Sequence, residues 1–400
     1  MDFHRDRRAA PHLRIGDQPG TADTPGSVNW PLTASLTQGS PRLPEFTLIQ
    51  ADIYDALLGI PDATFDAVIC DPPYGISITK NGVGANWDSS SIAFDRTLWA
   101  ELSRVVKPGG TLAAFGHPKT AHRQTTALED AGWQILDTVA WAKSHGYQAG
   151  NRSLETELRK TGAEALADEH AGFGTHLQPA YEPISIARNL PIRTSLIQAI
   201  ANGGAGGLNH DATRVKESDW AWNTPRATAL PTTENRARRP GRVTERSTWS
   251  IANRDAVSVP HRGGRLPGNL VVEHSESCTE LACEVGCVVG EIDAQGRTKY
   301  APGREPASRF FTRLRYSPRA RSSAAHGVAG APHPTEKPEQ LLEWLAALVV
   351  KPGGVVLDAF AGSGAVSEAV IRAGAGAVTA IERENAYCQL IRARVAEMDR

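Results

Sequence analysis

Residues 355–364 read Val355-Val356-Leu357-Asp358-Ala359-Phe360-Ala361-Gly362-Ser363-Gly364, an apolar run followed at once by a glycine-rich turn. Glycine permits a tight turn and lets backbone N–H groups come close to a ligand. A helical pattern continues to Ala373, and a second β-prone run, Val378–Ile381, leads directly to Glu382. An acid at that point can accept both hydroxyls of a ribose. Strand, glycine turn, helix, strand and acid in this order predict the nucleoside-binding half of a doubly wound α/β sheet.

The glycine turn lacks the signature of a phosphate-binding loop. Neither the third glycine of G-x-G-x-x-G nor a Lys followed by Ser or Thr is present after the turn. This pattern favours a nucleoside ligand without a pyrophosphate. A turn needed only for packing would explain the glycines alone, but Glu382 in register favours ligand binding.

The composition is that of a globular protein. The chain has 400 residues, of which 40% are hydrophobic and 22% charged, so two or three domains are expected and general disorder is excluded. The longest apolar run, Trp344–Val350, is far shorter than the roughly 20 residues that a membrane span needs. Five cysteines make no disulfide scaffold and the N-terminus has no apolar signal segment, so we expect a cytosolic protein without a membrane partner.

Short β-prone runs alternate with helical patterns on both sides of a long irregular stretch. Such alternation predicts a mostly parallel sheet with helices on both faces. The predicted strands are 47–50, 67–70, 111–115, 135–142, 184–187, 355–358 and 378–381, and the predicted helices are 96–106, 117–131, one from about Pro338, 362–373 and 384–397. Residues 1–45 are rich in Pro, Gly, Ser and Thr and predict a flexible tail.

Residues 191–330 form the irregular stretch, and much of it is basic. Within 211–330, 19 Lys and Arg stand against 13 Asp and Glu, which gives +6, whereas the rest of the chain carries −7. Two segments, 236–265 and 297–321, hold eight and seven Arg. A basic insert on an acidic scaffold predicts a surface for a polyanion, with a solvated irregular insertion as the plainer alternative.

A second motif, Asp71-Pro72-Pro73-Tyr74, directly follows the strand pattern 67–70. Ligands of open α/β sheets bind at the carboxyl ends of the strands. Two prolines stiffen the turn, so the Asp71 carboxylate and the Pro73 carbonyl can converge as acceptors on one exocyclic amino group. Tyr74 adds a flat face on which a base can stack. A proline turn capped by an Asp is the plainer alternative, which the strand context disfavours.

These two motifs together resemble the S-adenosylmethionine-dependent amino-methyltransferases of DNA. The catalytic motif precedes the Phe-x-Gly-x-Gly loop, an order similar to that of the permuted β-class of this family. Three further segments, His333–Pro338, Gln50–Tyr54 and Gln178–Ile184, are similar to elements of the family. Ala359 departs from the pattern, because relatives often carry Pro before the Phe.

The resemblance implies a circularly permuted, doubly wound, seven-stranded Rossmann-like methyltransferase sheet with an irregular basic insert. Its parts would be a flexible tail (1–45), a catalytic half (46–190), a target-recognition insert (191–330) and a cofactor-binding half (331–400). Neighbouring strands then come from opposite chain ends, so Asp71 and the glycine loop should share one edge of the sheet.

The resemblance also implies roles for individual residues in methylating a flipped base. Asp71 and the Pro73 carbonyl would accept the two N–H bonds of the target amine. Phe360 would pack on S-adenosylmethionine, and Asp52 would accept from its adenine amino group. The predicted catalytic residues are Asp71, Pro72, Pro73 and Tyr74, and the predicted cofactor-binding residues are Asp52, Lys337, Asp358, Phe360, Gly362, Ser363, Gly364 and Glu382.

Several targets and partners fit the motifs. The Asp form of the tetrapeptide is linked in the family mostly to N6 of adenine, which is the favoured target, and N4 of cytosine is the alternative. One rival function is methylation of RNA or of a protein glutamine, which the motif order disfavours. Another is a catalytically inert DNA-binding module, which the intact motifs disfavour. Double-stranded DNA is the implied partner, and a homodimer or a restriction enzyme partner stays open.

His274, Cys278, Cys283 and Cys287 fall within fourteen residues of the insert. Four N and S ligands are the number that a structural Zn²⁺ site uses. The spacing is not the usual paired C-x-x-C, so three reduced thiols in a small core stay an alternative to zinc.

Overall fold

The computed structural model describes residues 44–76, 90–144, 152–215, 264–279, 282–296, 307–316 and 336–398. The predicted tail lies outside these ranges except for its last two residues, which lead into the first strand. Residues 333–335 and most of the two Arg-rich segments also lie outside the described residues.

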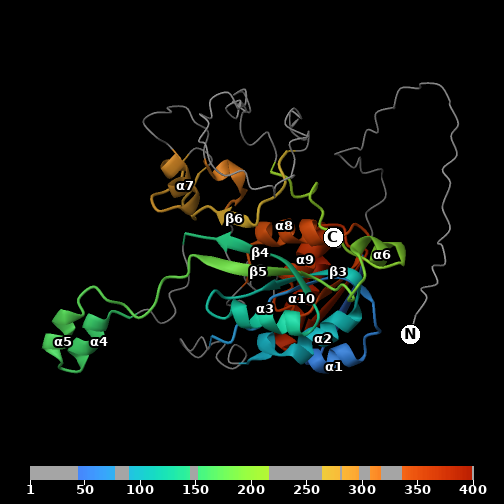
Figure 1. Cartoon of the computed structure of the whole chain (residues 1–400), viewed down its shortest axis with the longest axis horizontal. Helices are drawn as coiled ribbons and strands as arrows, with labels where there is room; N and C mark the ends of the chain where they lie inside the picture. The colour runs from blue at the N-terminus through green and yellow to red at the C-terminus, as the bar shows by residue number, and fades with distance from the viewer. Residues whose placement is uncertain are drawn as a thin grey trace, which may run out of the picture. The chain divides into compact units, whose positions relative to one another are not determined.

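One mixed sheet runs through the described part of the chain (Figure 1). The order of its strands is β1-β9-β8-β2-β3-β5-β4-β6-β7. Neighbouring strands are parallel, except that β5 is antiparallel to both β3 and β4. Each of the seven predicted strand patterns lies in a strand. The strands are β1 (Glu45–Gln50), β2 (Phe65–Cys70), β3 (Val106–Phe115), β4 (Gln134–Ala142), β5 (Tyr181–Arg188), β6 (Leu270–Glu273), β7 (Thr312–Leu314), β8 (Val355–Asp358) and β9 (Ala377–Glu382).

The prediction of seven strands is wrong, because the sheet has nine strands among the described residues and the insert supplies β6 and β7. β6 pairs with β4, which would otherwise be an edge strand with unpaired backbone groups. β6 and β7 have only four and three residues, too few to show a period in a segment rich in Gly and Pro. The insert is therefore irregular only in part.

The two ends of the described chain meet within the sheet. β1 lies beside β9, and β2 lies beside β8, so the halves before and after the insert form one continuous sheet. This pairing of neighbours from opposite ends is what the motif order led us to expect.

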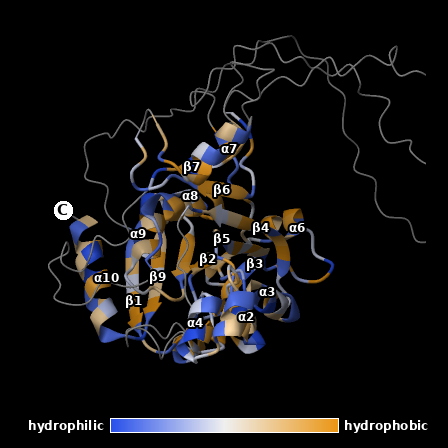
Figure 2. Ribbon diagram, turned by 90° about the vertical axis from the view of Figure 1, so that its left-hand side faces the viewer, coloured by the Kyte–Doolittle hydropathy of each residue, from blue (hydrophilic) through white to orange (hydrophobic). Residues whose placement is uncertain are grey.

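Helices cover both faces of the sheet, and the central strands are hydrophobic (Figure 2). Val68 and Cys70 of β2 belong to one buried cluster and Ile69 to the other, as the two-residue period of a strand requires. The first cluster packs under α1 (Ile53–Leu58), α2 (Arg96–Val105) and α3 (Ala121–Asp130), and the second under α8 (Glu339–Val349), α9 (Ala365–Arg372) and α10 (Asn385–Met398).

Four further helices lie in the connections. α4 (Leu154–Lys160) and α5 (Glu164–Glu169) pack on each other between β4 and β5, α6 (Leu196–Ala201) contacts β3, and α7 (Val288–Gly296) contacts β6. Single 3₁₀ turns occur at Ile92–Phe94 and Ala307–Phe310. Among the described ranges, no helix has the length and apolar character needed to cross a membrane.

Candidate active site

The two sequence motifs stand side by side at the carboxyl ends of neighbouring strands. Ile69 of β2 pairs with Asp358 of β8, so Asp71 and Phe360 each lie two residues beyond a paired position. The register therefore brings the Asp-Pro-Pro-Tyr turn and the glycine loop to the same edge of the sheet.

Two more predicted residues reach this edge from the other side of β8. Glu382 ends β9 and pairs with Gln50, which ends β1 two residues before Asp52. The four strands β1, β9, β8 and β2 are neighbours, and three spacings of about 4.8 Å amount to about 14 Å. A ligand in contact with all four strand ends must therefore be elongated.

The glycine loop is held by Glu382 and by its own backbone conformation. Gly362 and Gly364 have φ of 52° and 82°, in the left-handed region that favours glycine. The Gly362 N–H donates to Oε2 of Glu382 at 2.8 Å, and the Glu384 N–H donates to Oε1 at 2.7 Å. A Cβ at Gly364 would lie 3.0 Å from the side chain of Ile391 on α10. Burial raises the pKa of Glu382 above its ordinary value.

Asp358 is fully buried directly before the loop. Its Oδ2 accepts a hydrogen bond from Ser367 Oγ at 2.7 Å, whereas its Oδ1 has no partner among the described residues. Burial raises the pKa of Asp358 to about 7, and the charges of Glu382 and Asp71 add to the effect. A buried acceptor without a partner is satisfied when a ligand brings a donor.

Asp71 is oriented by two donors. The Tyr74 hydroxyl donates to Oδ1 at 2.8 Å, and Nζ of Lys337 donates to Oδ2 at 2.5 Å. Burial, with the charges of Asp71 and Glu182, raises the pKa of Tyr74 well above its ordinary value, so the hydroxyl keeps its proton. Lys337, predicted among the cofactor-binding residues, makes its ion pairs with Asp71 and, at 3.8 Å, with Glu182.

The turn that carries Asp71 is fixed while one carbonyl stays available. Pro72 is buried, and the Tyr74 carbonyl accepts from Thr120 Oγ1 at 3.0 Å. The Pro73 carbonyl accepts no hydrogen bond from the described residues. It can therefore act as the second acceptor that the motif predicts.

Two charged residues without a predicted role, Glu182 and Lys143, complete the group around Asp71. Glu182 lies near the start of β5, and the antiparallel direction of that strand brings it to this edge. Glu182 forms ion pairs with Lys143 and Lys337 and accepts from the Tyr74 hydroxyl at 3.4 Å. The signal that could have found it is the family-like segment around Tyr181-Glu182-Pro183.

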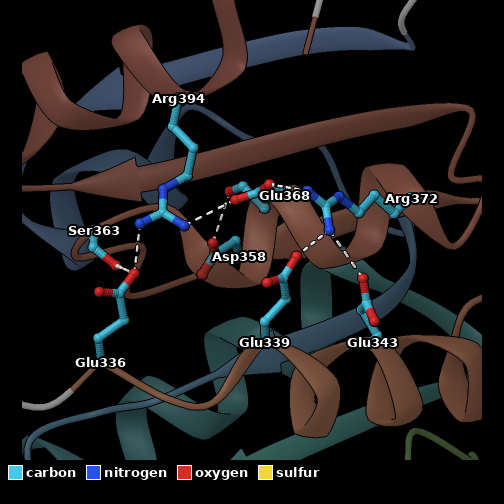
Figure 3. Close-up of polar contacts among 9 residues, drawn as sticks. Glu336, Glu339, Glu343, Asp358, Ser363, Glu368, Arg372 and Arg394 are labelled. Carbon is cyan, nitrogen blue, oxygen red and sulfur yellow. Dashed lines mark hydrogen bonds and ion pairs between the residues drawn. The ribbon is translucent and has the colours of Figure 1, made fainter. Parts of the chain in front are cut away.

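Ser363 uses its side chain to anchor the loop. Its hydroxyl donates to Oε1 of Glu336 at 3.0 Å, and the same oxygen accepts from Arg394 at 2.5 Å (Figure 3). Arg394 also donates to Glu368 at 2.8 Å, and all three charged side chains are largely buried. The proton of the Ser363 hydroxyl is thus committed to Glu336.

This buried network reaches the Asp71 carboxylate through the chain itself. Glu336 immediately precedes Lys337, so Arg394 on α10 is linked to Asp71 by two ion pairs and one peptide bond. On the surface side of the network, Glu368 also accepts from the more exposed Arg372 at 2.6 Å (Figure 3). Neither Glu336 nor Arg394 had a role predicted from the sequence.

The last two predicted cofactor residues lie at the same edge. Phe360 is half-buried and packs against the cluster under α1, α2 and α3. Asp52 caps α1, where its Oδ1 accepts from the Tyr54 N–H at 3.1 Å. The Asp52 side chain has no further hydrogen bond among the described residues, so its second carboxylate oxygen is available.

The predicted metal ligands also come together, in the insert. The ligand atoms of His274, Cys278, Cys283 and Cys287 all lie within 4.8 Å of one another. The fourteen-residue segment therefore folds back on itself.

Comparison with known proteins identifies the family. The family model of DNA methylases named N6_N4_Mtase matches residues 65–393, so the chain belongs to this family. S-adenosylmethionine is the cofactor of the family.

Individual relatives are distant. The Type II methyltransferase M2.LlaDCHI of Lactococcus lactis subsp. cremoris is 27% identical over 115 residues, which cover 24% of this chain and 42% of that protein. Among solved structures, the cytosine-N4-specific PvuII DNA methyltransferase is 11% identical at a TM-score of 0.46, covering 88% of this chain and 89% of its own. The M1.HpyAVI complex with S-adenosylmethionine is 14% identical at a TM-score of 0.38, covering 87% of this chain and 99% of its own.

Proposed function

We propose that the protein transfers a methyl group from S-adenosylmethionine to N6 of an adenine flipped out of double-stranded DNA, as a permuted member of its family. The observation that carries the proposal is the register of β2 and β8. It puts the amine-accepting motif and the glycine loop two residues beyond one paired position. Holding the two reactants next to each other is the main requirement of a two-substrate transfer.

The residues at the edge fit the cofactor chemically. The unpartnered Oδ1 of Asp358 would take an N–H donor, such as the ammonium group of the amino-acid end. Glu382 would accept from the ribose hydroxyls and the free oxygen of Asp52 from the adenine amino group, with Phe360 beside the ring. When bound, the cofactor supplies a methyl group on a positively charged sulfur.

Asp71 acts on the other reactant. Its carboxylate and the Pro73 carbonyl accept the two N–H bonds of the exocyclic amine, which otherwise delocalises its lone pair into the ring. Lys337 and the Tyr74 hydroxyl hold the carboxylate in place, and each of its oxygens keeps a lone pair for the amine. The Tyr74 ring offers the flat surface for the flipped base, and Asp71 also receives the proton that the nitrogen releases.

The insert supplies the contact with DNA in this proposal. Residues 191–330 carry the positive charge that a polyanion attracts, and β6 and β7 attach them to the sheet next to β4. The Arg of segment 297–321 that the structure describes include Arg313 in β7 and Arg315 just after it. Most such Arg contact phosphates, and a few read bases.

Mass spectrometry of nucleosides from treated nucleic acid tests the proposal. The full chain is incubated with S-adenosylmethionine and either duplex DNA of mixed sequence or RNA, and Asp71→Ala serves as the inactive control. We expect N6-methyldeoxyadenosine from DNA with the wild type alone. Detection of N4-methyldeoxycytidine instead would identify cytosine as the target base. Methylation of RNA only would refute DNA as the substrate.

A further inference from the structure

A second site lies in the insert, where His274, Cys278, Cys283 and Cys287 converge. His274 directly follows β6, Cys287 directly precedes α7, and the other two cysteines lie in the loop between them. Nδ1 of His274 lies 3.4 Å from Sγ of Cys283 and 3.8 Å from Sγ of Cys287. No ligand atom of the four is more than 4.8 Å from another.

The two N to S separations are close to those of tetrahedral coordination. Zn–S bonds of about 2.3 Å and Zn–N bonds of about 2.0–2.1 Å put the corners of a ZnNS₃ tetrahedron about 3.5–3.8 Å apart. The two measured N to S distances lie within about 0.3 Å of that range. Three sulfurs and one imidazole are a donor set that zinc prefers over the hard cations, which bind oxygen.

Two features of the surroundings suit a metal site. A Cβ at Gly290 in α7 would lie only 2.8 Å from Cβ of Cys283. Because glycine has no side chain, the exposed Cys283 can approach the helix. Glycine is unfavourable inside a helix relative to Ala, and the close approach explains its place here. The Glu284 N–H lies 3.4 Å from Sγ of Cys278, as a donor to a ligand sulfur should.

Apolar packing alone gives this loop little support. The buried cluster there consists of Val272, Cys287 and Val289, with a few half-buried neighbours. The loop between β6 and α7 has no strand or helix among its described residues, and small cores of this kind are commonly braced by a metal. Three reduced thiols would leave the close approach of all four ligand atoms without a cause.

We propose that His274, Cys278, Cys283 and Cys287 bind one structural Zn²⁺ that fastens the insert to the sheet. Four protein ligands close the coordination sphere, which distinguishes a structural from a catalytic zinc. The backbone N–H of His274 donates to the Leu314 carbonyl of β7 at 2.9 Å. The backbone N–H of Val288 donates to Oγ of Ser144, which lies just after β4, at 2.8 Å. The metal therefore joins β6, β7 and α7 to the outer part of the sheet.

Metal analysis of the full chain, purified under reducing conditions without added metal, tests the site. We expect elemental mass spectrometry to find one zinc ion per chain. After removal of zinc, added Co²⁺ should give the strong visible bands of tetrahedral cobalt and a thiolate charge-transfer band in the near ultraviolet. Neither readout depends on methyl transfer, so the test is independent of the proposed function.

Variants identify the ligands. Cys283→Ser changes an exposed side chain, so the protein should fold, and it should lose at least 90% of the zinc, as should Cys278→Ser. Cys388→Ala, a cysteine on α10 outside the cluster, should keep it. The proposal is overturned if the wild type holds no stoichiometric zinc and gives no charge-transfer band with cobalt, or if Cys283→Ser and Cys278→Ser both retain full zinc and the wild-type cobalt spectrum.

Discussion

The buried carboxyl of Asp358 should make the stability of the ligand-free protein depend on pH. Burial raises its pKa from the ordinary 3.8 to about 7, so the folded protein keeps a proton on Asp358 that the unfolded chain releases. The contribution of Asp358 to the unfolding free energy is fully present below about pH 4 and is lost as the pH rises through about 7. Three pKa units correspond to about 4 kcal/mol in total.

The change to make is Asp358→Asn, which keeps the shape and removes the titration. The Asn oxygen can still accept from Ser367 Oγ. Between pH 5 and pH 8 the wild type should lose about 2–3 kcal/mol of unfolding free energy through Asp358, and the variant should not. The cost of the substitution that does not depend on pH cancels in the difference between the two pH values.

Urea denaturation of both proteins, followed by tryptophan fluorescence at pH 5 and at pH 8, measures this difference. From pH 5 to pH 8, the unfolding free energy of the variant relative to that of the wild type should rise by about 2–3 kcal/mol. Nearby Glu382 titrates in both proteins and so contributes to both curves. An equal stability difference at the two pH values would refute the reasoning, because Asp358 would then be ionised in the folded state at pH 5.

Three further predictions concern the residues that support the site. Arg394→Met leaves Glu336 buried without a cation and should cost about 3–5 kcal/mol of unfolding free energy, while Glu368 keeps its ion pair with Arg372. Arg372→Met, whose ion pairs are more exposed, should cost about 1 kcal/mol or less, and equal losses in urea denaturation would contradict this. Lys337→Met should lower kcat about 10²-fold and leave the Kd for S-adenosylmethionine, measured by calorimetry, nearly unchanged. A loss of cofactor binding with a normal kcat would instead show that Lys337 binds the cofactor. Gly364→Ala should destabilise the protein by about 1–2 kcal/mol, because φ is 82° and the new methyl group would press on Ile391; an unchanged melting midpoint would contradict it.

The sequence was sufficient for the parts of the fold with clear periods. The apolar run before Asp358 and the glycines after it predicted a strand and turn that the structure contains. The motif order predicted that β1 and β2 would lie beside strands from the other chain end, which the sheet order confirms. The two short strands of the insert were missed, because three or four residues carry no period.

Side-chain partners within the site were harder to predict, because they depend on contacts between distant segments. Lys337 was assigned to the cofactor by its motif, and only the folded chain puts its ammonium on Asp71. Glu182 reaches the same group because β5 runs antiparallel, a direction that its composition does not reveal. The buried pair of Glu336 and Arg394 joins residues 58 positions apart, and no local pattern marks it.

The central claim is that one pocket at this edge holds the methyl donor against the amine-accepting motif. The most direct measurement is a crystal structure of the full chain with S-adenosylhomocysteine. We predict that the nucleoside lies between Phe360 and Glu382 and that the sulfur lies on the side of the glycine loop that faces Asp71. A ligand bound on another face of the sheet, or an Asp71 carboxylate directed away from the sulfur, would contradict the account.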